Sequence, residues 1–207
     1  MQNQLEYIKS KLKFVDDEIL LEGNHSVMMG WERPIMKASA DIVCENGGNI
    51  LNIGFGLGII DSYIQNKKIK SHTIIECHPD VLKRMRQLGW YEKNNVTIIE
   101  GFWQNHIDLI SGFDGVYFDT WKEQDMYVFL KKVHNIMNKN GILSFFNPCE
   151  ITKDYHSISQ DFYEIIKEKF FISSKIINLT YNGNLDGIDE YWNKNKDKTS
   201  IPICRLK

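Results

Sequence analysis

Three glycines and one glutamate are the first residues in this chain whose spacing suggests chemistry. Gly54, Gly56 and Gly58 follow an apolar run at 50–53, and Glu76 ends a second apolar run 22 positions after Gly54. Glycines let a backbone approach a ligand closely, and a carboxylate at the next strand end can accept hydrogen bonds from two ribose hydroxyls. A tight turn without a ligand would explain the glycines but not the spacing of Glu76. The pattern therefore predicts a nucleoside-binding site.

The glycine spacing distinguishes between two kinds of nucleoside cofactor. The dinucleotide fingerprint G-x-G-x-x-G requires glycine at position 59, where this chain has Ile59. The G-x-G-x-G pattern found here is similar to the first motif of S-adenosylmethionine-dependent methyltransferases, whose cofactor carries no phosphate. The sequence thus favours S-adenosylmethionine and leaves a nicotinamide dehydrogenase as a distant alternative.

Two further carboxylates suggest a cationic substrate. Asp119 ends the apolar run at 116–118, and Glu32 stands at the entrance of a predicted helix. A turn cap or a helix dipole would explain either residue without a ligand. Two carboxylates in one pocket nevertheless favour a cation, because unpaired they repel each other and one takes up a proton. A guanidinium fits best, since its planar fork binds carboxylates bidentately and stays charged.

The same carboxylates could also promote a reaction. A guanidinium nitrogen must lose a proton, or have its charge drawn away, before it can attack the methyl carbon of a sulfonium. Paired carboxylates could draw that charge and accept the proton, in a site closed to water. Trp121 could form a wall of the substrate pocket, and Phe102 and Trp103 could stack on adenine, although core packing explains each aromatic residue at least as well.

The rest of the sequence predicts the elements that bring these residues together. Strands are expected at 50–53, 73–75, 95–100, 113–119 and 141–147, alternating with helices that include 79–88, 126–137 and 155–169, and an antiparallel pair at 170–181 and 199–206. This order predicts an α/β fold, a doubly wound Rossmann-like sheet with an antiparallel edge hairpin. Residues 1–30 are expected to form an N-terminal helical flap or lid outside the core. Ligands bind at the carboxyl ends of such strands, here Gly54, Glu76, Gly101, Asp119 and Asn147.

Composition limits the class of protein. A chain of 207 residues, 43% of them hydrophobic, is expected to form a single domain over 1–207. The net charge of −2 gives no reason to expect nucleic acid or an anionic membrane as a partner. Neither the four cysteines nor the histidines have the spacing of a metal site. With no signal peptide or membrane span in the sequence, we expect a cytoplasmic protein.

Longer segments resemble a known family. They are SVMMGWERPIMKASAD, ILNIGFGLGIIDSYIQ, SHTIIECHPDVLKRMRQLGWYEKNNVTIIEG, FDGVYFDT and GILSFFN. Together they resemble the arginine methyltransferases that modify the internal, delta, nitrogen of the guanidino group and, more distantly, guanidinoacetate N-methyltransferase. The resemblance covers about residues 20–150 and resumes near 191–192 and 201–204.

This resemblance implies roles for individual residues. Glu32 and Asp119 would grip the guanidino group, and Met28 and Met36 would pack over the cofactor. The other implied cofactor contacts are Gly54, Phe55, Gly56, Gly58 and Ile59 at the methionine part, Glu76, Cys77 and His78 at the ribose and adenine, and Phe102 and Trp103 at the adenine. Asn147 and Cys149 are candidates for substrate binding. Pro148 between them has no N–H group, so a substrate carboxylate must be held in some way other than by that residue.

The resemblance and the charge argument lead to one expectation with alternatives. We expect an S-adenosylmethionine-dependent N-methyltransferase that acts on free L-arginine at the delta nitrogen. The missing N-terminal extension of the protein-modifying enzymes favours a small substrate. The alternatives are a protein arginine methyltransferase, an enzyme for another small guanidino compound such as guanidinoacetate, and a regulator that binds cofactor without catalysis. The oligomeric state is left open, with a homodimer as one alternative.

Overall fold

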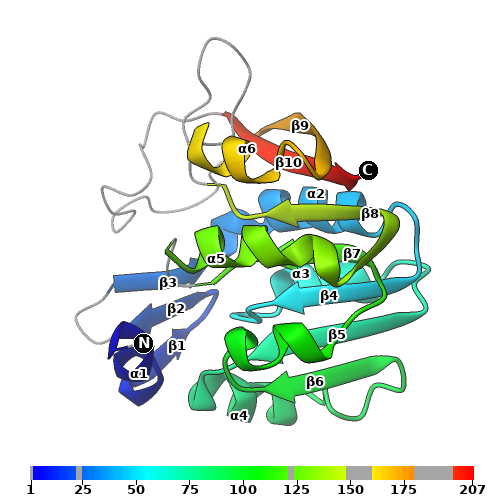
Figure 1. Cartoon of the computed structure of the whole chain (residues 1–207). Helices are drawn as coiled ribbons and strands as arrows, with labels where there is room; N and C mark the ends of the chain where they lie inside the picture. Colours follow the sequence, from blue (N-terminus) through cyan, green and yellow to red (C-terminus); the bar gives the residue numbers. More distant parts are fainter. Residues whose placement is uncertain (1, 22–24, 121–123, 148–159, 180–197) are drawn as a thin grey trace.

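The computed structural model describes residues 2–21, 25–120, 124–147, 160–179 and 198–207. Within them, a seven-stranded sheet has the order β6-β5-β4-β7-β8-β10-β9 (Figure 1). Its strands are β4 (Asn49–Ile53), β5 (Ser71–Glu76), β6 (Val96–Glu100), β7 (Phe113–Phe118), β8 (Met137–Phe145), β9 (Phe170–Asn178) and β10 (Lys198–Leu206). The first five strands are parallel, and β10 is antiparallel to both β8 and β9. The predicted α/β fold with an antiparallel edge hairpin is confirmed.

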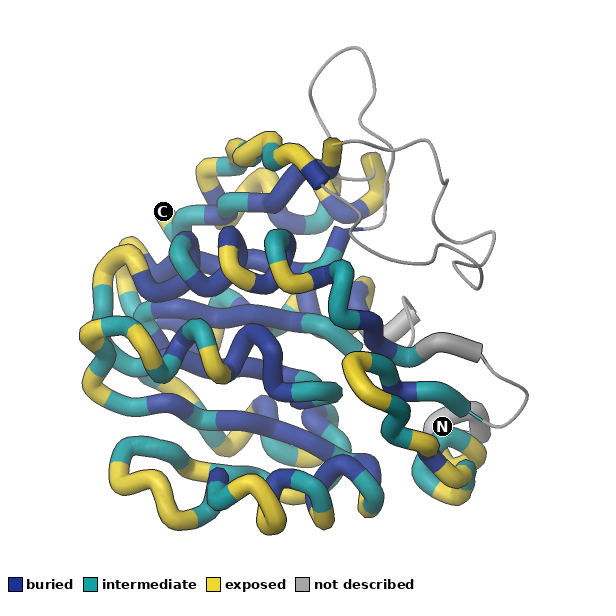
Figure 2. Tube along the Cα trace, turned by 180° about the vertical axis from the view of Figure 1, so that it is seen from behind, coloured by how far each residue is buried: buried dark blue, intermediate teal, exposed yellow. Residues whose placement is uncertain are grey.

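Helices cover both faces of this sheet. They are α2 (Arg33–Val43), α3 (Ile59–Gln65), α4 (Pro79–Gln87), α5 (Gln124–Lys132) and α6 (Gln160–Ile166). Residues alternate along each strand, so Leu51 packs in the cluster that contains Phe129 of α5, whereas Ile50 packs in the cluster that contains Ile60 of α3. The central strands are buried along their length (Figure 2). This packing holds the strand ends at fixed positions.

The carboxyl ends of the parallel strands form one edge of the sheet. In the sheet, β4 lies between β5 and β7. The chain first adds β5 and β6 on one side of β4 and then returns to add β7 and β8 on its other side. At the end of β4, Gly54 N donates to Ile75 O (2.9 Å) and Asp119 N donates to Ile53 O (3.0 Å). Strand order therefore reverses at β4, which is the place where open α/β sheets form their ligand crevice.

The N-terminal segment lies beside this edge (Figure 1). It consists of α1 (Gln2–Lys9) and a separate antiparallel sheet of β1 (Leu12–Val15), β2 (Glu18–Leu21) and β3 (His25–Met29). Leu12, Ile19 and Met28 are buried and belong to the same hydrophobic cluster as α2 and α3. The expectation that this segment lies outside the core is therefore wrong for these three side chains.

Two element boundaries differ from the prediction. The helix expected to reach Met137 ends at Lys132, because a 3₁₀ turn follows at Val133–Asn135 and Met137 pairs with Phe113 as the first residue of β8. Only Gln160–Ile166 of the helix expected at 155–169 is helical among the residues that are described, which begin again at 160. None of the helices described is long and apolar enough to cross a membrane.

Candidate active site

The glycine turn between β4 and α3 has a backbone that other residues could not easily adopt. Gly54, Gly56 and Gly58 have φ angles of +93°, +55° and +72°. A Cβ on Gly54 would lie 1.9 Å from the Asp119 carbonyl oxygen, and one on Gly56 would lie 2.5 Å from Met28 Sδ. Left-handed φ angles together with these close approaches require glycine. The turn therefore brings its backbone directly against β7 and β3.

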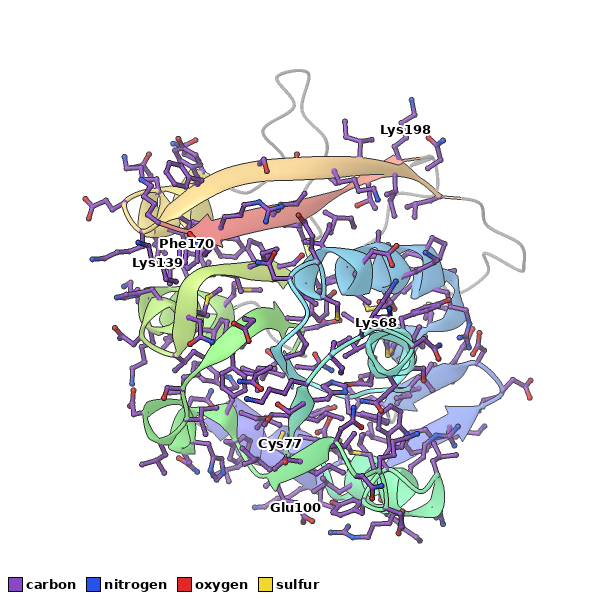
Figure 3. The ribbon with its side chains drawn as sticks, turned by 90° about the vertical axis from the view of Figure 1, so that its right-hand side faces the viewer. Lys68, Cys77, Glu100, Lys139, Phe170 and Lys198 are labelled. Carbon is purple, nitrogen blue, oxygen red and sulfur yellow. The ribbon has the colours of Figure 1, made fainter. Side chains whose placement is uncertain are left out.

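Glu76, at the tip of β5, binds this turn through its side chain. Its Oε2 accepts a hydrogen bond from Phe55 N (3.0 Å), and its Oε1 accepts from Cys77 N (2.6 Å) and His78 N (2.7 Å). Figure 3 labels Cys77 directly after β5 and Glu100 at the end of β6, which mark this edge. A carboxylate has about four acceptor positions. With the bonds of the described residues counted, one acceptor position on Oε2 is therefore open, and a ligand with two hydroxyls would require Glu76 to give up a backbone partner.

Glu32 and Asp119 lie on the opposite side of the turn from Glu76. Glu32 is buried at the start of α2, and its Oε1 accepts a hydrogen bond from Met29 N (2.9 Å). Asp119 directly follows β7 and is half-buried. In the part of the chain that the structure describes, neither carboxylate forms an ion pair with lysine, arginine or histidine. Among the described residues, these two acids therefore have no basic partner.

The electrostatics of these two acids follow from their surroundings. Burial raises the pKa of Asp119 to about 7. Burial, followed by the charge of Asp119, raises the pKa of Glu32 to about 8, although the hydrogen bond from Met29 N opposes the shift. Desolvation and a like charge both disfavour the ionised form. A cation between the two carboxylates would reverse these effects.

Met28 and Met36 occupy different environments. Met28 Sδ accepts a hydrogen bond from Leu57 N (3.1 Å), so its side chain lies on the glycine turn. Met36 is fully buried on α2, and its Sδ accepts from the Tyr117 hydroxyl (3.6 Å). Met28 thus lies on the glycine turn, whereas the Met36 sulfur contacts Tyr117 in the core.

Several other residues that were predicted to contact the cofactor have side chains that pack in the core. Ile59 packs in the cluster between the sheet and α3. Trp103 packs edge-on against Phe118 and Phe129, with ring centroids 5.7 Å and 5.4 Å away. His78 is buried, and its Nδ1 accepts from Asp80 N (3.1 Å) at the start of α4. The side chains of these three residues are therefore buried in the core.

The structure describes some of the remaining predicted site residues and not others. Phe102 is half-buried after β6, and Asn147 is buried just beyond β8. Phe146 N donates to Phe118 O (3.1 Å), which brings the end of β8 beside β7. Trp121 and Cys149 lie outside the described residues, as do 191–192.

Sequence reasoning missed two groups near the site. Tyr7 of α1 lies with its ring 4.8 Å from the His78 ring, and its pKa is raised by burial and by the charges of Glu76, Cys77 and Asp119. Asn52 and Asp61 are fully buried and hydrogen-bonded to each other behind the glycine turn. Asn52 interrupts an apolar strand, and this interruption was a signal in the sequence. Nothing in the local pattern around Tyr7 indicated its position.

Comparisons with known proteins identify relatives of this chain. The family described as guanidinoacetate N-methyltransferase matches residues 4–188. Protein arginine N-methyltransferase 2 of Candida glabrata is 44% identical over 153 residues, which are 68% of this chain and 37% of that protein. The protein of the same name from Saccharomyces cerevisiae is 41% identical over 179 residues, 80% of this chain and 43% of that one. The chain thus spans less than half the length of these relatives.

Solved structures share the fold at low sequence identity. Precorrin-6y C5,15-methyltransferase from Geobacter metallireducens has a TM-score of 0.58 at 16% identity, covering 84% of this chain and 87% of that chain. A tRNA (m1A58) methyltransferase from Aquifex aeolicus has a TM-score of 0.57 at 15% identity, covering 87% and 70%. The fold together with the related sequences identifies the class of S-adenosylmethionine-dependent methyltransferases, which confirms the predicted cofactor.

Within this class, the family match identifies a smaller group of proteins. Because the family match covers most of its residues, the chain belongs to the guanidinoacetate N-methyltransferase family. Its similarity to the proteins named protein arginine N-methyltransferase 2 confirms the resemblance predicted from the sequence.

Proposed function

We propose that this chain methylates the guanidino group of arginine, with free L-arginine as the substrate and the internal nitrogen as the acceptor. The observation that carries the proposal is the pair Glu32 and Asp119, two acids with raised pKa values beside the glycine turn. A guanidinium is the side-chain cation whose flat fork can satisfy two carboxylates at once. A guanidinium bound between them would explain why a buried and a half-buried carboxylate affect each other's charge at this place.

The cofactor half is formed by the glycine turn and Glu76. The glycines bring the backbone close, Met28 covers the turn, and the free acceptor position of Glu76 Oε2 holds a ribose hydroxyl. S-adenosylmethionine supplies an electrophilic methyl group on a sulfonium. The backbone contact between Gly54 and Asp119 joins the two halves, so the carboxylates hold their ligand next to the turn.

The substrate half orients the guanidino group and takes up its proton. When the cation binds, Glu32 and Asp119 ionise and pair with its terminal nitrogens. The internal nitrogen is then the one without a carboxylate partner, which makes it the acceptor. The carboxylates would draw positive charge onto the terminal nitrogens, and the N–H proton of the methylated internal nitrogen would pass, through the adjacent terminal nitrogen, to one of the two carboxylates as the base.

A second candidate substrate is an arginine side chain in a protein. The relatives from yeasts carry the name protein arginine N-methyltransferase 2, and this is the observation that favours it. The same carboxylate pair would hold a peptide arginine as well as a free one. The two substrates therefore differ in what contacts the rest of the molecule, and not in how the guanidino group is gripped.

The test is methyl transfer from isotopically labelled S-adenosylmethionine to free L-arginine, guanidinoacetate and an arginine-containing peptide. Mass spectrometry with fragmentation of the product identifies the nitrogen that is modified. We expect label on free arginine, at the internal nitrogen. Label on the peptide alone would show that the substrate is a protein arginine and not free arginine. Label on none of the three would contradict the proposal.

A further inference from the structure

A buried hydrogen-bond network lies directly behind the glycine turn. Asn52, Asp61 and His72 are all fully buried, on β4, α3 and β5. Asn52 Nδ2 donates to Asp61 Oδ1 (2.8 Å) and to Gly54 O (2.9 Å). His72 Nε2 lies 3.2 Å from the same Asp61 oxygen, although the two atoms are not aligned for a regular hydrogen bond. The network therefore connects a buried acid to a carbonyl of the turn.

The orientation of the Asn52 amide is fixed by its partners. Its NH₂ group has two N–H donors, and each of them meets an oxygen acceptor. Turned by half a rotation, the amide would present its own oxygen to a carboxylate and a carbonyl, and all three would repel one another. Asp61 thus holds Asn52 in the one orientation that donates to Gly54 O.

The Gly54 carbonyl is part of a peptide unit that also reaches Glu76. In a trans peptide the C=O of one residue and the N–H of the next point in opposite directions. The C=O of Gly54 accepts from Asn52, and the N–H of Phe55 donates to Glu76 Oε2 at 3.0 Å. A rotation of this single peptide plane would break both bonds together.

We propose that Asp61 and Asn52 are positioning residues for cofactor binding, because they fix the Gly54–Phe55 peptide plane that holds Glu76 in place. The inference rests on the proposed function only in that Glu76 receives the ribose. Neither residue contacts the ligand, and their effect is confined to the cofactor side. Substitutions here therefore weaken binding of the cofactor and leave the methyl-transfer rate at saturating cofactor nearly unchanged.

An exchange of the two side chains separates this role from a merely structural one. Asn52→Asp alone removes both donors and places two carboxylates together, so both the melting temperature and the cofactor affinity fall. Adding Asp61→Asn restores a hydrogen bond between positions 52 and 61, because the new amide at 61 donates to the new carboxylate at 52. The Gly54 carbonyl still lacks its donor. Stability recovers, and the affinity does not.

The readout is the Kd of S-adenosylhomocysteine by calorimetry, with the melting temperature measured in parallel. We expect the double variant to bind about tenfold more weakly than the wild type, in line with the loss of one hydrogen bond. An affinity that recovers together with stability would overturn the proposal. Asn49→Ala is the control: it removes a bond to Gly112 O (3.0 Å) at the far end of the same strand and should leave Kd unchanged.

A second pair of variants tests the idea if the double variant does not fold. Asp61→Asn keeps an oxygen that accepts from Asn52 and should bind as the wild type does, whereas Asp61→Ala releases the amide and should weaken binding about tenfold. The amide proton of Phe55 should move upfield in the NMR spectrum of Asp61→Ala only. Equal affinities would overturn the positioning role. A wild-type protein that binds no S-adenosylhomocysteine would instead contradict the proposed function.

Discussion

The two halves of the site treat their carboxylates in opposite ways. Glu76 is buried but accepts three backbone N–H groups, so the chain itself satisfies it. Glu32 accepts one backbone N–H, and burial raises the pKa values of both Glu32 and Asp119. Hydrogen-bonded carboxylates are stable without a ligand, whereas buried carboxylates near each other are not. The cofactor half is therefore organised in advance, and the substrate half needs a cation to complete it.

The largest expected effect comes from breaking the substrate half. Asp119→Asn removes one charge of the pair and the group that accepts the proton, so turnover should fall on the order of a hundredfold or more. Cofactor affinity should stay within about twofold, because the variant leaves Glu76 and its partners unchanged. Radiolabel transfer and calorimetry measure the two quantities.

The control for this variant is Asp108→Asn, which removes an exposed carboxylate paired with Lys132. Such surface pairs contribute little to stability, and turnover should not change. Full turnover in Asp119→Asn would show that the pair does not act as proposed.

A smaller effect is expected from breaking the cofactor half. Glu76→Gln replaces one acceptor oxygen by an NH₂ group that cannot accept from the backbone, so cofactor affinity should fall about tenfold. Glu100→Gln is the matched control, because Glu100 pairs with Glu76 in register at the end of β6 and its side chain binds Arg86 on the surface. If the two variants weakened the cofactor equally, the hydrogen bonds of Glu76 would have no special role.

The smallest expected effect is on thermal stability. Its dependence on pH tests whether the substrate half holds a carboxylate with a raised pKa. The pKa of Glu32 rises from 4.5 to about 8 on folding, so its stabilising contribution is complete below about pH 4.5 and is lost as the pH rises through 8. Glu32→Gln cannot ionise and avoids this loss. Between pH 5 and 9, the melting temperature of the wild type should therefore fall relative to Glu32→Gln by several degrees. A difference that moved in the opposite direction would contradict the raised pKa.

The sequence predicted the parts of this molecule that follow from local pattern. Glycine spacing and apolar runs located the turn, the strand ends and Glu76, because strand order and handedness leave few alternatives for such a chain. Asp119 directly follows an apolar run, and this position was enough to predict that it lies at the same edge of the sheet. Charge chemistry then connected Asp119 with Glu32, and the charge of Asp119 is one of the two causes that raise the pKa of Glu32.

The sequence could not predict what depends on side-chain direction. Trp103 and Ile59 are next to the strand ends in sequence but point into the core. Tyr7 reaches the site because α1 packs on the β5–α4 turn, where His78 Nε2 donates to Tyr7 O (3.1 Å), and this long-range contact has no local signal. The Asn52–Asp61 pair required knowledge of which faces of β4 and α3 meet.

The most direct test of the central claim is the proton balance of substrate binding. L-arginine is titrated into the protein in the presence of S-adenosylhomocysteine, by calorimetry at pH 7 in buffers of different ionisation enthalpy. A guanidinium that pairs with Glu32 and Asp119 must ionise both, so we predict release of about one proton at pH 7, less in Asp119→Asn and none near pH 10. Binding at pH 7 without proton release would contradict the claim that this pair is the guanidinium site.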